Sequence, residues 1–223
     1  QGGNRKIHLR EVRMRTHYMQ QLSELEDLLG KMGGLIISGF KDAREAIASR
    51  SAESIRDATK VEGRTDVKLD EIDRLCSLLL LTQPVASDMR FIVSVMNIVV
   101  DMERIGDQVR DIAETAGKCK SEIHVPELDE MAADCEFMIR GALESFVGRD
   151  LDRAEKIIAR DDAVDTAFDK LKLKLSDWVK SGYDVEDLLN LLMIGKYLER
   201  IGDHATNIAE WTSYVVTGNK KPA

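Results

Sequence analysis

The feature that most constrains the fold of this chain of 223 residues is a segment that occurs twice. Residues 103–107 read Glu-Arg-Ile-Gly-Asp, and residues 199–203 read the same, at an offset of 199 − 103 = 96 residues. Similarity at one fixed offset is the mark of a duplicated structural unit. We therefore predict two similar units, residues 1–122 and 123–223, joined near residue 122.

The spacing of the apolar residues predicts helices in both units. They recur three and four positions apart over long stretches, and no stretch alternates as a strand would. The expected helices cover residues 7–48, 51–81, 84–117, 126–147, 150–180 and 184–217. Helices of about 30 residues are about 45 Å long, which suits bundles. The predicted fold is all-α, with two tandem antiparallel three-helix bundles.

Residues that favour helix starts stand at most of these boundaries. Ser51, Asp150 and Asp184 are expected N-caps, and Thr82 with the proline two residues later marks another start. Pro126 suits a first helical turn and lies close to the expected joint between the two units.

Charge and cysteine content exclude several classes of function. The 32 Lys and Arg against 40 Asp and Glu give a net charge of −8, which argues against a nucleic-acid partner. Cys76, Cys119 and Cys135 form no Cys-x-x-Cys pattern, so we expect a reducing cytoplasm and neither disulfides nor a structural zinc site. No export signal or segment of about 20 apolar residues is present, so we expect no direct membrane insertion.

Acidic residues four apart form a ladder on the third helix of each unit. The ladders are Glu103, Asp107 and Asp111 in the first unit, and Glu199, Asp203 and Asn207 in the second. At 100° per residue, the apolar positions between them fall on the opposite side of each helix. Each ladder should therefore lie on an outer face.

The preceding helix of each unit carries its own acidic pair. These pairs are Glu62 with Asp66, and Asp161 with Asp165. Each pair is as far in sequence from the turn near Pro84 or Gly182 as the ladder on the other side of that turn. Antiparallel neighbours bring such residues to one level, so four acids should meet in each unit.

Clustered carboxylates repel one another, and a bound cation removes that repulsion. Oxygen ligands suit Mg, Ca, Mn or Fe. The alternative is a solvated acidic face in which Arg104 and Arg200 serve as partners.

A carboxylate-bridged helical-bundle metalloenzyme is the enzymatic alternative, but such enzymes use inward Glu-x-x-His ligands, which neither ladder has. His204 is expected to be a hydrogen-bonded surface histidine rather than a ligand. No catalytic constellation is visible.

Two longer segments contain the repeated motif and are distinctive as sequences. The first is residues 83–90 leading into 101–107, and the second is residues 197–210. In both, the chain resembles the PhoU family of bacterial phosphate-uptake regulators, and the resemblance covers nearly the whole chain. It implies duplicated three-helix bundles that bind multinuclear iron or zinc clusters at surface E(D)xxxD motifs. Asp111 stands where the motif more often carries Asn, which makes the first site more anionic.

Carried over to this sequence, the motif falls on the two ladders, with the acidic pairs as partners across each helix pair. The resemblance implies a non-enzymatic cytoplasmic regulator that couples the Pst phosphate transporter to the PhoR/PhoB two-component system. It would act negatively on the phosphate-starvation response. The implied partners are the transporter ATPase subunit PstB, through which the protein would sit at the inner membrane, the sensor kinase PhoR, and a second copy of the chain.

Overall fold

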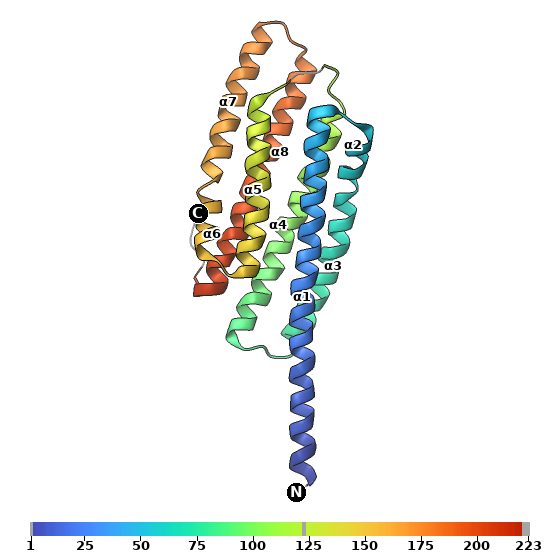
Figure 1. The fold of residues 1–223 in the computed structure, drawn as a ribbon, viewed down its shortest axis with the longest axis vertical. Coiled ribbons are helices and arrows are strands. Elements are labelled where there is room, and N and C mark those ends of the chain that lie inside the picture. The colour runs from blue at the N-terminus through green and yellow to red at the C-terminus, as the bar shows by residue number, and fades with distance from the viewer. Residues whose placement is uncertain (1, 122–123, 220–223) are drawn as a thin grey trace.

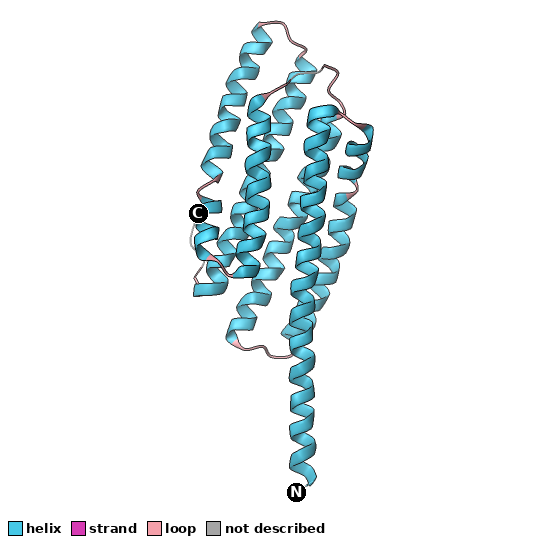
Figure 2. Ribbon diagram, viewed as in Figure 1, coloured by secondary structure: helices cyan, strands magenta, loops and turns pink. Residues whose placement is uncertain are grey.

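A computed structural model describes residues 2–121 and 124–219, with the side chains of the first helix from Arg15 onward. Every regular element in these ranges is a helix (Figures 1 and 2). The first half holds α1 (Gly2–Ser49), α2 (Ala52–Thr59), α3 (Val61–Leu80) and α4 (Ala86–Ala116). The second half holds α5 (Pro126–Gly148), α6 (Leu151–Ile158), α7 (Asp161–Lys180) and α8 (Val185–Thr217). The expected joint at residue 122 lies outside the described ranges and stays a prediction.

The expected all-α repeat is confirmed, but the second predicted helix of each half is broken into two. The helix predicted over residues 51–81 is broken at Lys60, and that predicted over 150–180 is broken at residues 159–160. Neither break contains glycine or proline, so the sequence gives no local signal for it. The short helices α2 and α6 pack against α4 and α8, respectively, and the chain bends to follow them.

The predicted caps mostly hold. The side chains of Ser51, Asp150 and Asp184 each accept a hydrogen bond from a backbone N–H in the first turn that follows. Pro126 occupies the first turn of α5. The Thr82 prediction was wrong: Val85 precedes α4 without a side-chain cap, and the Thr82 hydroxyl instead donates to the Leu79 carbonyl.

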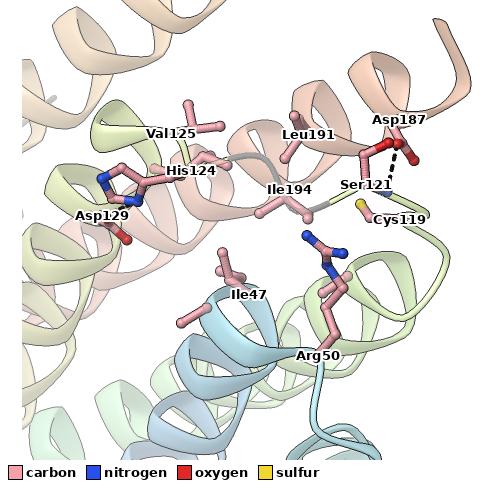
Figure 3. Close-up of a pocket in the computed structure, with 13 residues that line it drawn as sticks. Ile47, Arg50, Cys119, Ser121, His124, Val125, Asp129, Asp187, Leu191 and Ile194 are labelled. Atoms are coloured by element: carbon pink, nitrogen blue, oxygen red, sulfur yellow. Dashed lines mark hydrogen bonds and ion pairs between the residues drawn. The ribbon is translucent and has the colours of Figure 1, made fainter. Parts of the chain in front are cut away.

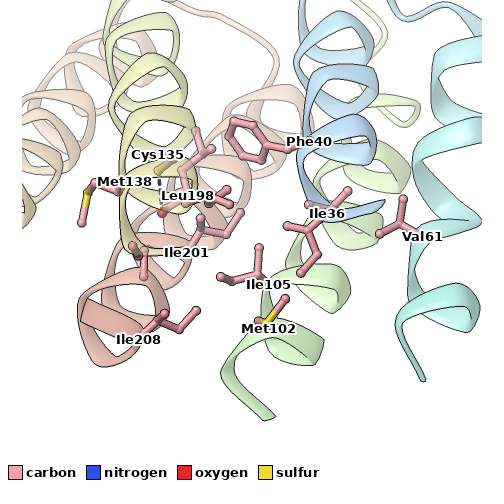
Figure 4. Close-up of a cluster of buried hydrophobic side chains, with 14 of the residues drawn as sticks. Ile36, Phe40, Val61, Met102, Ile105, Cys135, Met138, Leu198, Ile201 and Ile208 are labelled. Carbon is pink, nitrogen blue, oxygen red and sulfur yellow. Dashed lines mark hydrogen bonds between the residues drawn. The ribbon is translucent and has the colours of Figure 1, made fainter. Parts of the chain in front are cut away.

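The buried apolar side chains form one continuous cluster that includes both repeats. Ile36 and Phe40 of α1, Ile105 of α4, and Leu198 and Ile201 of α8 contribute to it (Figure 4). Helices α4 and α8 pack against each other along this core. The two third helices, which carry the ladders, are therefore held side by side.

The orientation expected for the ladders is correct. The apolar residues on the opposite side of each ladder are fully buried, so the acidic residues face outward. These buried residues are Met102, Ile105, Val109 and Ile112 in α4, and Leu198, Ile201, Ala205 and Ile208 in α8.

Candidate functional site

The first acidic cluster lies between α3 and α4 and consists of Glu62, Asp66, Glu103 and Asp107. Burial, and then the carboxylate of Asp107, raises the pKa of Glu103, and both acids of α3 add to this effect. Burial, followed by Glu62 and Asp107, likewise raises the pKa of Asp66. The four carboxylates therefore act on one another across the helix pair.

The second acidic cluster lies between α7 and α8 and consists of Asp161, Asp165, Glu199 and Asp203. Burial and then the carboxylate of Asp203 raise the pKa of Asp161 to about 6. Burial and then Glu199 raise the pKa values of both Asp165 and Asp203. The structure thus brings four predicted site residues together in each half.

The glycine of the repeated segment explains why the helices come close enough for these acids to meet. A Cβ atom added to Gly106 would lie 2.7 Å from Oγ1 of Thr65, and one added to Gly202 would lie 2.8 Å from Oδ1 of Asp161. Real Cβ contacts are longer than this, so only glycine fits without a local shift. Both helix pairs use this close approach at the level of their acids.

The break in each second helix also positions an acid. Glu62 lies in the first turn of α3, and Asp161 lies in the first turn of α7. The N-terminus of a helix carries a partial positive charge and favours carboxylates. Uninterrupted helices would not offer this stabilisation at the clusters.

Arginine side chains neutralise the first cluster. Arg110 pairs with Glu62 on α3 and with Asp111, whose Oδ1 lies 2.8 Å from Nη2. Arg104 lies 3.2 Å from Asp107 and 3.4 Å from Glu103. Asp111 is thus paired with an arginine, with which any cation would have to compete.

The second cluster has a different neighbour at the position equivalent to Arg110. At the offset of 96 residues this position is Thr206, which carries no charge. Lys196 pairs with Glu199, and no cation is paired with Asp161 among the described residues. The second cluster therefore keeps more of its charge repulsion.

Two buried oxygen atoms of the second cluster have no hydrogen-bond partner among the described residues: Oδ1 of Asp161 and Oγ1 of Thr206. Both residues line a cavity of about 450 Å³ together with Asp203 and with Arg200, which is paired with none of the four acids in the ion pairs of the described residues. Buried polar atoms are nearly always paired with protein, water or an ion. The oxygen donors around this cavity suit a hard cation.

The side chains of Asn207 and His204, on α8, contact an acidic residue of the first half. The Asn207 amide donates to Oδ1 of Asp101 over 3.1 Å, and the His204 Nδ1 atom lies 2.9 Å from the same oxygen. Asn207 lines the same cavity as Asp203 while holding α4. The expectation that His204 is hydrogen-bonded is confirmed, although it is half-buried rather than fully at the surface.

Two residues that shape the clusters were missed from the sequence: Arg110 and Asp101. Arg110 could have been found, because it lies three residues after Asp107 and differs from its repeat partner Thr206. Asp101 has no such signal, since its contacts lie on the other repeat, more than 100 residues away.

One known protein family matches each of the two halves of the chain separately. The family model described as "PhoU domain" matches residues 29–116 and again residues 128–212. The chain belongs to the PhoU family.

Proteins similar over nearly the full length carry the same name. A phosphate-specific transport system accessory protein PhoU homolog of Synechocystis is 33% identical over 211 residues, which is 93% of this chain and 94% of the relative. The homolog of Clostridium acetobutylicum is 32% identical, over 92% of this chain and 97% of the relative. These relatives are described as accessory proteins, not as enzymes.

Solved PhoU structures share the fold. The phosphate transport system regulatory protein PhoU of Streptococcus pneumoniae matches with a TM-score of 0.87 and 26% identity, over 92% of this chain and all of that one. PhoU of Pseudomonas aeruginosa gives 0.86 and 29%, over 91% of this chain and all of that one.

Within the described residues, no three His, Cys, Asp or Glu side chains are already arranged around one point as metal ligands. The clustered carboxylates would have to rotate about their side-chain bonds to share an ion. None of the described helices is long and apolar enough to cross a membrane.

Proposed function

We propose that this chain is a non-enzymatic regulator of phosphate-specific transport that binds metal ions at its acidic clusters. The observation that carries the proposal is the full-length similarity to phosphate-specific transport system accessory proteins, which includes both repeats. The protein would work in the cytoplasm, at the inner membrane through the transporter. It would couple the Pst transporter, through PstB, to the sensor kinase PhoR and reduce the PhoR/PhoB starvation response when phosphate is plentiful.

Exposed apolar side chains support protein contacts of this kind. Around the turn between α3 and α4, Leu78, Leu81 and Val85 are 53%, 80% and 65% exposed. Large exposed apolar groups near one another favour protein interfaces. Such contacts include the homodimer that we also propose.

The second acidic cluster is the better metal site. Asp161, Asp165, Glu199 and Asp203 would supply carboxylate oxygens. Thr206, whose buried hydroxyl has no partner among the described residues, lines a cavity together with Asp161 and Asp203. The residues fit a hard, oxygen-preferring ion such as Fe, Mn, Mg or Ca; a zinc cluster of oxygen ligands is the other candidate. A bound ion would supply positive charge that offsets the carboxylate repulsion and holds α7 against α8.

The first cluster must give up an ion pair before it binds metal. Arg110 occupies Glu62 and Asp111, so a cation competes there with a guanidinium that is already in place. We therefore propose that Glu62, Asp66, Glu103, Asp107 and Asp111 form the weaker of two sites.

The metalloenzyme alternative is not favoured by the geometry. Carboxylate-bridged oxidases hold their metals inside a bundle core. Here the core sides of α4 and α8 are apolar, and Asp66, Asp165 and Asp203 are exposed.

Metal content tests the sites directly. We would purify the protein without a metal-affinity tag and compare it with the variant Glu103→Gln, Asp107→Asn, Glu199→Gln and Asp203→Asn by elemental analysis. Stoichiometric metal that is lost in the variant supports the sites. Equal or absent metal in both proteins would show that the clusters are solvated faces.

The regulatory role needs a separate test. A strain that lacks the gene should express a starvation-controlled phosphatase in high phosphate, and the wild-type gene should restore repression. Co-purification with PstB and PhoR would support the adaptor role. Unchanged repression in the deletion strain would contradict the role, whatever the metal content.

A further inference from the structure

A second cavity shares no lining residue with the acidic clusters and lies between the end of the first half and the start of the second. Its volume is about 470 Å³, within the range of small-molecule sites. It is lined by the end of α1, the chain that follows α4, and the starts of α5 and α8 (Figure 3). Both repeats therefore contribute to one cavity.

The body of this cavity is apolar. Ile47, Val125, Leu128, Leu191 and Ile194 line it. A bare inorganic ion would exchange water for hydrocarbon over somewhat more than half of this surface, which is unfavourable. The lining suits a molecule with an apolar body instead.

The acidic groups of the cavity are already paired. Asp187 is fully buried and accepts the backbone N–H groups of Lys120 and Ser121, over 2.7 Å and 2.9 Å. Burial alone would raise the pKa of Asp187, but these hydrogen bonds lower it. At the rim, Asp129 lies 3.4 Å from the imidazole of His124. Neither carboxylate needs a ligand.

Arg50 is the charged group that remains. Its side chain points from the end of α1 toward Ser121 and Ile194 (Figure 3). The residue is half-buried, and its guanidinium makes no hydrogen bond or ion pair with the described residues, whereas its backbone N–H donates to the Ala46 carbonyl over 3.0 Å. Its φ of 52° lies in the left-handed region, where residues other than glycine are disfavoured.

The second repeat offers a direct contrast. Arg149 follows α5 as Arg50 follows α1, and it has nearly the same φ, 51°. Its guanidinium stacks over the ring of Phe91, 5.9 Å from the ring centre. Arg149 therefore has a partner within the fold, whereas Arg50 projects into a cavity.

We propose that this cavity binds a small organic anion, with its charged group on Arg50 and its apolar body against Leu191 and Ile194. Because both repeats line the cavity, the ligand would contact the end of α1 and the start of α8 together. The site is independent of the acidic clusters and of the metal proposed there.

The test uses two fluorescent probes that differ in charge. 8-Anilinonaphthalene-1-sulfonate carries the anionic group, and N-phenyl-1-naphthylamine has the same rings without it. We expect Arg50→Gly to weaken sulfonate binding about tenfold or more, as loss of a charge-assisted contact would. Binding of the neutral probe should change little. Because glycine favours a positive φ, this variant should fold with an unchanged or higher midpoint of thermal unfolding.

Two further variants serve as controls. Arg149→Gly makes the same backbone change outside the cavity and should bind the sulfonate as the wild type does. Ala116→Leu adds volume at a buried position of the cavity wall and should weaken both probes. Wild-type affinity in Arg50→Gly, or an equal loss in Arg149→Gly, would overturn the proposal.

Cys119 reports the location of the bound probe. It lines the cavity and is half-buried, whereas Cys76 and Cys135 are fully buried. Alkylation by iodoacetamide, followed by mass spectrometry, should be slowed at Cys119 by the sulfonate. Unchanged alkylation at saturating probe would overturn the proposal, as would displacement of the probe by millimolar inorganic phosphate.

Discussion

The two acidic clusters are built on the same repeated segment, but they balance their charge differently. In the first, Arg110 bridges α4 to α3 through Glu62. In the second, Thr206 takes the place of this arginine, and the buried oxygen of Asp161 has no partner among the described residues. The two copies of the segment therefore build the same four-acid arrangement, while the residue at one position, Arg110 or Thr206, changes how much of the carboxylate charge is paired.

Exchanging these two residues should have the largest effect on the difference in metal affinity between the two clusters. Thr206→Arg should weaken metal binding at the second cluster by about tenfold to a hundredfold, because a guanidinium would pair with Asp161. Arg110→Thr should strengthen binding at the first cluster. Isothermal titration calorimetry with Mn²⁺ measures both, and Arg56→Thr is the matched control, because Arg56 is an exposed arginine that pairs with Asp57 rather than with an acid of either cluster. Identical titrations for Thr206→Arg and the wild type would contradict the proposed asymmetry.

Alanine at the two shared glycines should lower the free energy of unfolding more in the first half than in the second. Gly106→Ala pushes against Thr65, which is fully buried and bonded to the carbonyl of Glu62 over 2.8 Å. We expect the free energy of unfolding to fall by about 1–2 kcal/mol, because the higher helix propensity of alanine offsets only part of the cost of overpacking. In Gly202→Ala the added Cβ comes too close only to the carboxylate of Asp161, which can rotate, and makes ordinary contacts with Val164 and Met138, so the free energy of unfolding should change little. Urea denaturation measures both, and equal losses would contradict the difference.

The pH dependence should also differ between the halves in metal-free protein. The pKa of Asp161 is raised to about 6 in the folded state. Its protonated form therefore stabilises the fold fully below about pH 4, and this contribution is lost as the pH rises to about 6. Asp161→Asn should remove this dependence and stabilise the protein at pH 7 by about 1–2 kcal/mol, allowing for solvent screening.

The equivalent change in the first half should have the opposite sign. Glu62→Gln removes the charge that pairs with Arg110, so we expect a loss of about 0.5–1 kcal/mol at pH 7. Urea denaturation between pH 4 and pH 8 measures both variants. If both were stabilising, the ion pair would not account for the difference between the clusters.

The smallest expected effect is at the link between the halves. Asp101→Asn weakens the contacts to His204 and Asn207 and should cost about 1 kcal/mol or less. This corresponds to about 2–4 °C in the midpoint of thermal unfolding for a chain of this size. Asp73→Asn, at a half-buried acid on α3, serves as a control. A larger loss would mean that Asp101 stabilises the fold through more than these two contacts.

Much of this architecture could be predicted from the sequence, because helical periodicity is local. Contacts three and four residues apart decide which face of a helix is apolar, so the burial of Ile105 and Ile201 follows from spacing. Ser51, Asp150 and Asp184 cap their own first turns for the same reason. The duplication then predicts that the same order of helices forms again in the other half.

What only the tertiary structure decided depends on how helices lie against one another. The breaks at Lys60 and residues 159–160 set off the short helices α2 and α6, which pack against α4 and α8, and neither glycine nor proline marks them. The ion pair between Arg110 and Glu62 joins positions 48 residues apart. Whether such side chains meet depends on the axial register and rotation of two packed helices, which are set by the whole shared core rather than by the spacing within either segment.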